Sequence, residues 1–143
     1  MTQSDEIGEV HWQGMRQAME QDGIDGLRDL VESLAEGPER RALYAFAQRA
    51  FSGRDWEGKS LDGVAAVARL GIDEALAQQD TGRANVMSFN LAADLADCWP
   101  GDETTRERRH FELGLAAARD CVRWRQELDV TPDKHSMAWW AQG

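Results

Sequence analysis

Apolar side chains recur along this chain at the spacing of an α-helix. From Leu27 to Leu34 they stand at positions i, i+3, i+4 and i+7, which places them in one stripe on one helix face. A second stripe runs from Leu43 to Phe51, and Val, Ile and Thr never alternate with polar residues over the length of a strand. Alanine, leucine, glutamate and arginine, all strong helix formers, dominate the composition. The pattern therefore predicts an all-α fold.

Glycine, proline and capping residues divide this pattern into about seven helices. Ser60 is the expected cap of the fourth helix, and Thr104 with Glu107 fits a capping box for the sixth. The connections are short, so we expect antiparallel neighbours within a single domain, residues 1–143. The predicted helices run from Ser4 to Gln21, from Asp25 to Gly37, from Pro38 to Gly53, from Leu61 to the break at Asp80, from Arg83 to Trp99, from Thr104 through Val122, and from Pro132 to the end.

Two of the later helices carry apolar residues that we expect to face the core. In the fifth helix these are Val86, Phe89, Ala93 and Ala96, and in the sixth they are Phe111, Leu115, Ala118 and Val122. Gly71 interrupts the stripe of the fourth helix, where glycine costs about 1 kcal/mol relative to alanine. We therefore expect a kink at Gly71 or the close approach of another helix.

Three stretches share one texture, in which aromatic residues are followed by small ones. They are Ala42-Leu43-Tyr44-Ala45-Phe46-Ala47, Ser88-Phe89-Asn90-Leu91-Ala92 and Ala138-Trp139-Trp140-Ala141-Gln142-Gly143, with a trace of a fourth around Trp12. This texture resembles the first helix of the tetratricopeptide repeat, a helix–turn–helix unit. The resemblance covers about residues 40–143. The spacing departs from the family, since 45 residues separate Tyr44 from Phe89 and 51 separate Phe89 from Trp140, against about 34 in a regular array.

The resemblance implies tetratricopeptide-like helical hairpins stacked into an α–α superhelix. Members of that family typically bind an extended peptide along the concave surface and do no chemistry there. Asn90 matches the asparagine that bonds the ligand backbone in peptide-clamping members, although it could instead bond a neighbouring loop or helix carbonyl. Those members also present lysine or arginine nearby, and here Arg40, Arg41 and Lys134 are available. The implied function is a non-enzymatic module that binds a protein or peptide.

The charge balance adds a different possibility. The formal net charge is −10, and residues 1–37 hold nine acidic and two basic side chains, a net charge of −7. A phosphate backbone would be repelled by that end, so nucleic-acid binding is disfavoured. One interpretation is a solvated acidic face that aids solubility. The other is attraction of a basic partner, as in an immunity or antitoxin protein that neutralises it.

The sixth helix is rich in arginine although the protein is acidic. These arginines could form salt bridges to Asp94 and Asp97 across the hairpin and to neighbours on their own helix. Alternatively they form a basic patch that binds an acidic peptide or the acidic first helix of a second copy. Arg119 and Arg123 are therefore candidate binding residues. The arginines of this helix are Arg106, Arg108, Arg109, Arg119, Arg123 and Arg125.

Six tryptophans accompany a single tyrosine in this chain. Trp139 and Trp140 are helix neighbours about 100° apart, so they point to different sides. One can pack on the preceding hairpin, and the other needs a second surface. We expect this last helix to cap the stack and to donate a tryptophan to a partner, such as a second copy.

Motifs for catalysis or metal binding are weak. Glu107 and His110 have the Glu-x-x-His spacing of carboxylate metal sites, but neither His11 nor His135 has a glutamate three residues earlier. Cys98 and Cys121 are expected several helical turns apart, too far to share an ion with His110. The sequence predicts no metal, no cofactor and no catalytic residue. A small helical enzyme or ligand-binding bundle that uses carboxylates remains the alternative.

The beginning of the chain has no basic segment followed by an apolar one, so no secretory signal is predicted. Apolar runs are shorter than a membrane span requires, so no membrane partner is expected either. Two cysteines are too few for a disulfide scaffold. These observations favour a cytoplasmic protein with reduced thiols.

Overall fold

The computed structural model describes residues 3–53, 60–96, 105–128, 137 and 139–142. Within these ranges the chain is helical and contains no strand, which confirms the all-α prediction. Five helices are defined, and the described residues near the C-terminus are also helical. The helices are α1 (Gln3–Leu34), α2 (Gly37–Gly53), α3 (Leu61–Ala77), α4 (Thr81–Leu95) and α5 (Arg108–Glu127).

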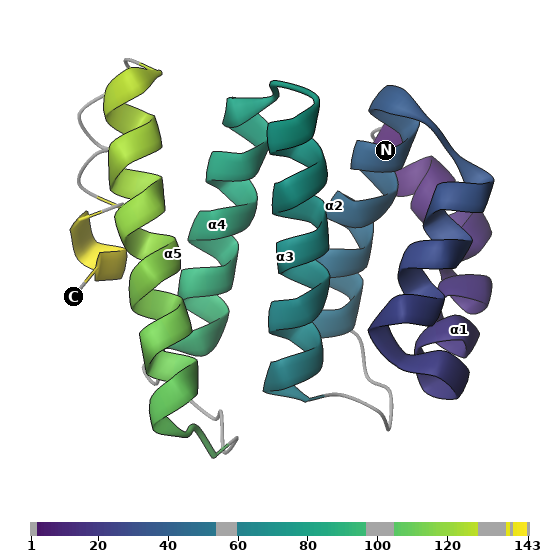
Figure 1. The fold of residues 1–143 in the computed structure, drawn as a ribbon, viewed down its shortest axis with the longest axis horizontal. Helices are drawn as coiled ribbons and strands as arrows, with labels where there is room; N and C mark the ends of the chain where they lie inside the picture. Colours follow the sequence, from purple (N-terminus) through teal and green to yellow (C-terminus); the bar gives the residue numbers. More distant parts are fainter. Residues whose placement is uncertain (1–2, 54–59, 97–104, 129–136, 138, 143) are drawn as a thin grey trace.

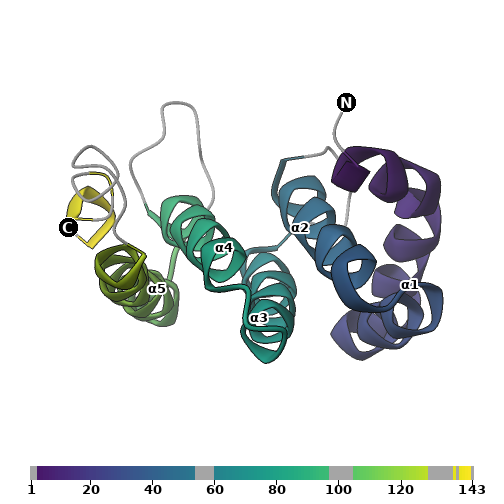
Figure 2. The same cartoon turned by 90° about the horizontal axis from the view of Figure 1, so that it is seen from above.

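The helices alternate between two layers, so that each one packs against its neighbours in sequence (Figure 1). Seen from above, α2 and α4 lie in one layer and α3 and α5 in the other (Figure 2). Helices two apart in sequence also touch, as α2 and α4 do. The result is an elongated stack with α1 at one end and α5 at the other (Figure 1). Any surface on α1 is therefore remote from any surface on α5.

The first two predicted helices are joined into one element. α1 continues through residues 21–25 and bends at Gly23, whose backbone angles are φ 69° and ψ −153°. Side chains disfavour this region strongly, so glycine is needed there. The predicted stop at Gln21 is thus a bend rather than a loop, and the expected count of seven separate hairpin helices is not confirmed.

Several predicted boundaries are confirmed by their local geometry. The Ser60 hydroxyl accepts a hydrogen bond from the Gly63 amide at 3.0 Å and caps α3. Gly37 has φ +58° between α1 and α2, a left-handed conformation that favours glycine. The Asp80 carboxylate accepts from the Arg83 amide at 3.1 Å and caps α4.

Two arginines cap the C-terminal ends of helices that precede them in the chain, and the sequence of those helices does not predict these contacts. Arg40 donates to the Ala35 and Glu32 carbonyls at the end of α1. Arg106 donates to the Leu95 and Asp94 carbonyls at the end of α4. These groups satisfy helix carbonyls that have no intrahelical partner. α4 consequently ends at Leu95, earlier than the predicted end at Trp99, which lies outside the described residues.

α5 begins at a different residue from the predicted one. Its N-cap is Glu107, whose backbone amide donates to His110 Nδ1 at 3.0 Å, whereas Thr104 lies outside the described residues. His110 Nε2 lies 2.9 Å from Asp62 Oδ1 on α3. Because Nδ1 accepts a hydrogen bond from the Glu107 amide, the proton of the neutral ring lies on Nε2, which donates a hydrogen bond to the Asp62 carboxylate. Glu107 and His110 thus join α5 to α3.

One core extends through the stack from α1 to α5. At the α1 end, Trp12 packs edge-on against Phe46 and Phe51, with ring centroids 6.3 and 5.0 Å away. A Cβ at Gly71 would lie 2.2 Å from Met87 Cε and 3.1 Å from Tyr44 Cβ. Gly71 is therefore a site of close helix approach, one of the two alternatives predicted for it.

The inward faces of α4 and α5 agree only in part with the prediction. Ala118 and Val122 are buried as expected, whereas Val86 and Phe111 are 54% and 46% exposed. α5 instead turns small residues toward α4, and a Cβ on Gly114 would lie 3.2 Å from Leu95 Cβ. This small-residue contact brings the two helices close and rotates Phe111 away from the core. The buried residues of α5 are His110, Gly114, Ala117, Ala118, Cys121, Val122, Trp124 and Arg125.

Candidate functional site

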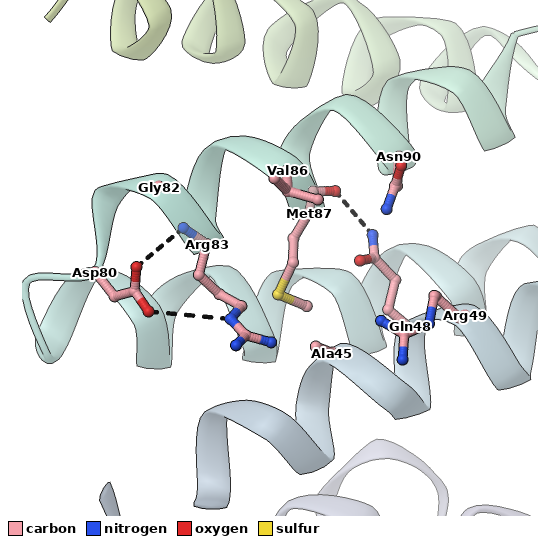
Figure 3. Close-up of a pocket in the computed structure, with 9 residues that line it drawn as sticks. All are labelled: Ala45, Gln48, Arg49, Asp80, Gly82, Arg83, Val86, Met87 and Asn90. Carbon is pink, nitrogen blue, oxygen red and sulfur yellow. Dashed lines mark hydrogen bonds and ion pairs between the residues drawn. The ribbon is translucent and has the colours of Figure 1, made fainter. Parts of the chain in front are cut away.

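A groove runs between α2 and α4 on the layer that they share. Its main part has a volume of about 380 Å³. Figure 3 shows its lining, which combines polar side chains from both helices with an apolar floor. The residues that line it are Ala45, Gln48, Arg49, Asp80, Gly82, Arg83, Val86, Met87 and Asn90.

The groove exists because α3 holds α2 and α4 apart in the other layer (Figure 2). A single buried hydrogen bond ties the two walls together, from Gln48 Nε2 to the Met87 carbonyl at 2.8 Å. Gln48 is almost fully buried, so this bond fixes its amide at the floor of the groove. Val86 projects from α4 into the open part, which explains its exposure.

The groove continues past Asn90 toward the C-terminal end of α4. This second part has a volume of about 230 Å³ and shares Gln48, Arg49 and Asn90 with the first. From Gly82 to Asp94 the wall spans twelve residues, or about 18 Å at the helical rise. An extended peptide of five or six residues covers that length.

Charged groups of both signs border this groove. Arg83 Nε lies 3.9 Å from the Asp80 carboxylate, which also accepts from Arg41 at 2.7 Å. Arg49 pairs with Asp5 of α1 at 2.9 Å, and both side chains are exposed to solvent. Exposed pairs of this kind are weak and are easily exchanged for a ligand group.

Asn90 is the one predicted binding residue that lies in this groove. It is partly buried on α4, and its side chain reaches toward α2 beside the amide of Gln48 (Figure 3). The expected alternative, a bond to a neighbouring carbonyl, does not occur among the described residues. The amide of Asn90 is therefore available to the groove.

Arg40 and Arg41 were considered as possible partners of Asn90, and they are engaged elsewhere. Arg40 caps α1 and lies 3.4 Å from Glu74, and Arg41 pairs with Asp80 at the turn before α4. Neither lines the groove. The basic side chains that do so are Arg49 and Arg83. Lys134 lies outside the described residues.

Arg119 and Arg123 are exposed on α5, and neither lines the groove. Arg123 lies 3.2 Å from Asp120 of the same helix, and its guanidinium is 5.4 Å from the centre of the Trp124 ring. Of the arginines expected to reach the preceding helix, Arg106 does so and donates to the Asp94 backbone carbonyl, and Arg123 has the expected kind of partner on its own helix. Asp97 lies outside the described residues.

Trp139 and Trp140 are each about half exposed, at 55% and 54%. The Trp140 ring centroid lies 6.4 Å from that of Phe89 on α4. Arg125 covers the same phenylalanine, with its guanidinium 4.9 Å from the ring centre. Trp140 therefore packs on the preceding helices while keeping an open face, as expected for one of the two tryptophans.

The described residues offer little for catalysis or metal binding. No group of three His, Cys, Asp or Glu side chains in this part of the chain is placed to hold an ion. Arg109 and His110 donate hydrogen bonds to Asp62 and lower the pKa of its carboxyl from 3.8 to about 2. Cys121 is buried against Asn85, with Sγ 2.9 Å from Oδ1, and burial raises the pKa of its thiol. These groups join helices and do not open into the groove.

Gln48, Arg49 and Arg83 are groove residues that the sequence did not identify. A signal was present, because Ala45, Gln48, Arg49 and Ser52 form a second stripe beside the apolar one on α2. Arg83, Val86, Asn90 and Asp94 form the corresponding stripe on α4. That the two stripes face each other depends on the layer arrangement, which neither helix pattern contains.

Comparisons with protein-family models, with curated proteins and with solved structures find no match for this chain. No described helix is both long and apolar enough to cross a lipid bilayer.

Proposed function

We propose that this protein is a non-enzymatic binding module that holds a protein segment in extended form between α2 and α4. The observation that supports this most directly is the groove itself, which is about 380 Å³ in its main part and continues past Asn90. Its mixed lining, an apolar floor with a few fixed polar groups, is typical of ligand sites. The tetratricopeptide-like texture of residues 88–92 agrees with the same function.

The amide of Asn90 is the expected point of recognition, and the almost fully buried Gln48 is expected to hold the floor of the groove beneath the ligand. An extended peptide offers a backbone N–H and C=O at each residue, and a side-chain amide can pair with both. Gln48 is held by Met87, so its orientation is set before any ligand arrives. Preorganised polar groups lose little entropy on binding, which favours affinity.

Arg49 and Arg83 add charge at the sides of the groove. Each is already paired with an aspartate, so a ligand carboxylate would have to exchange with Asp5 or Asp80. Exchange at the exposed Arg49–Asp5 pair changes the free energy little, whereas Asp80 is partly buried and also holds Arg41. We therefore assign affinity to the backbone contacts and the Val86 surface, and selectivity among peptides to the arginines.

Selection from a display library of random twelve-residue peptides tests this proposal. Peptides selected on the wild-type protein should bind much more weakly to Val86→Trp, because the indole fills the open part of the groove. Val10→Trp is the matched control, since Val10 is 77% exposed on α1 and lies outside the groove. Fluorescence anisotropy with a labelled selected peptide measures both affinities.

A second substitution addresses the amide directly. Asn90→Ala removes a hydrogen-bonding group without touching the core and should weaken binding roughly tenfold, the equivalent of one lost polar contact. Selected peptides that bind Val86→Trp and wild type equally would show that the groove is not the binding site. Failure to select any peptide would also count against the proposal.

A further inference from the structure

The exposed face of α5 carries two arginines one helical turn apart. Arg119 and Arg123 point away from the core, opposite the buried residues of the same helix. Arg123 has Asp120 beside it at 3.2 Å. Arg119 forms no ion pair with any described residue. At this end of the stack the described C-terminal helical residues lie beside α5 (Figures 1 and 2), and both arginines remain exposed.

The second half of α1 and the residues just after its end carry a complementary acidic stripe at the opposite end of the stack. Four exposed carboxylates follow the spacing i, i+4, i+7 and i+11 after the bend at Gly23. Leu27 and Val31 are buried on the other side of this segment, so the carboxylates face outward. Arg28 is the basic side chain paired with them, 3.4 Å from Asp25 and 3.7 Å from Asp29. The acidic residues are Asp25, Asp29, Glu32 and Glu36.

The two faces carry opposite charges, and the charged residues on each face have the same spacing. Arg119 and Arg123 are separated by four residues, as are Asp25 and Asp29, so each pair spans about 6 Å along its helix. α1 and α5 lie at opposite ends of the stack, so one chain cannot bring these pairs together (Figure 1). Pairing α5 with α5 would set arginine against arginine, which disfavours a symmetric dimer.

We propose that copies of this chain associate head to tail, with the Asp25–Asp29 face of one copy docked on the Arg119–Arg123 face of the next. Such a contact joins different surfaces, so it leaves a free acidic face and a free arginine face at the two ends and permits further addition. The described C-terminal helical residues lie beside α5 (Figure 1), and the half-exposed Trp139 among them offers an apolar group to the same contact. The contact does not involve the groove between α2 and α4.

Charge reversal at each face gives a test in which success and failure are both clear. Arg119→Glu with Arg123→Glu makes one variant, and Asp25→Arg with Asp29→Arg makes the other. All four side chains are exposed, or nearly so, and none contributes to the core, so both variants should fold, as circular dichroism and thermal melting would verify. Association is measured by sedimentation velocity at about 0.1 M salt. At this ionic strength charges more than about 10 Å apart are screened, whereas ion pairs in direct contact remain effective.

The wild-type chain should associate in a concentration-dependent way, and each reversed variant alone should sediment as a monomer. An equimolar mixture of the two variants should associate again, because acidic and basic faces are once more opposed. Arg69→Glu is the matched control on α3, where the arginine is exposed and pairs with Asp73, and it should associate like wild type. Trp139→Ala should weaken the association.

A wild-type chain that remains monomeric at roughly 100 µM would overturn the proposal. So would a mixture that stays monomeric, or an arginine-reversed variant that associates as wild type does. Peptide binding in the groove is measured with the same proteins, and it should be unchanged in both reversed variants. The two proposals can therefore fail independently.

Discussion

A methyl group added at Gly8 would collide with the ring of Phe46, which packs against Trp12 in the core. The Cβ of Gly8→Ala would lie 2.0 to 2.5 Å from three ring carbons of Phe46. Carbon atoms pack at about 3.5–4.0 Å, so the ring would have to move by about 1.5 Å. Phe46 is buried and packs against Trp12, so it has little room to do so.

Two effects of opposite sign decide the outcome at this position. Alanine favours the helix over glycine by about 0.5–1 kcal/mol. Overpacking a filled core costs about 1–3 kcal/mol. Gly8→Ala should therefore lower the free energy of unfolding by about 1–2 kcal/mol, which in a chain of this size lowers Tm by about 2–6 °C.

Gly14→Ala on the same helix is the matched control. Its Cβ would meet only Leu30 Cδ2 at 3.7 Å, an ordinary contact, so it should raise stability by about 0.5–1 kcal/mol. Urea unfolding followed by circular dichroism measures both values. Equal effects at the two positions, or stabilisation by Gly8→Ala, would show that the α1–α2 packing is wrong. Adding Phe46→Leu to Gly8→Ala should recover part of the loss through relief of the collision.

Three further predictions concern the bend, the α3–α5 junction and the buried thiol. Gly23→Ala should destabilise the protein by about 1–3 kcal/mol in urea unfolding, because φ 69° with ψ −153° excludes a side chain, and a neutral result would mean that the bend is absent. The pKa of Asp62 is lowered from 3.8 to about 2 in the folded protein, so its contribution to stability is present above pH 3.8 and lost as the pH falls toward 2. Asp62→Asn should therefore destabilise the protein more at pH 7 than at pH 2, as unfolding at both pH values would measure, and an equal loss of stability at the two pH values would contradict the Asp62–Arg109–His110 contact. In a Cys98→Ser background, Cys121 should react with a thiol reagent at least about 100-fold more slowly in the native state than in guanidinium chloride, because its sulfur is buried and its pKa is raised, and fast native labelling would contradict this burial.

Helices with local signals could be predicted closely from the sequence. The stripe from Leu43 to Phe51 and the cap at Ser60 depend on neighbours within one or two turns, and both are present in the structure. The bend at Gly23 was recognised as a break, because glycine marks it. What could not be read was that the chain continues as helix on both sides.

The errors arise from contacts between distant segments. The rotation of α5 follows from small residues at Gly114 and Ala117 that let α4 approach, so Phe111 loses its expected place in the core. The early end of α4 follows from Arg106, which comes from the next segment of chain. Such contacts override local propensity and leave no periodic signal in either helix.

Only one residue of the groove was predicted from the sequence as a binding residue. Asn90 was singled out because of its resemblance to a known repeat, and it does line the space between α2 and α4. Gln48 was not identified, because its sequence position beside an apolar stripe does not show a partner for its amide. That partner, the Met87 carbonyl, comes from α4 and is known only from the structure. Its role depends on how far apart α3 holds the two helices.

The proposed binding surface between α2 and α4 is tested most directly by nuclear magnetic resonance of ¹⁵N-labelled protein titrated with a selected peptide. The largest amide shift changes should fall in residues 45–52 and 80–94, the segments that line the groove. Asn90 and Gln48 side-chain amides should shift with them. Changes confined to α5 or to the residues around Trp139, with those segments unaffected, would show that peptides bind this protein somewhere else.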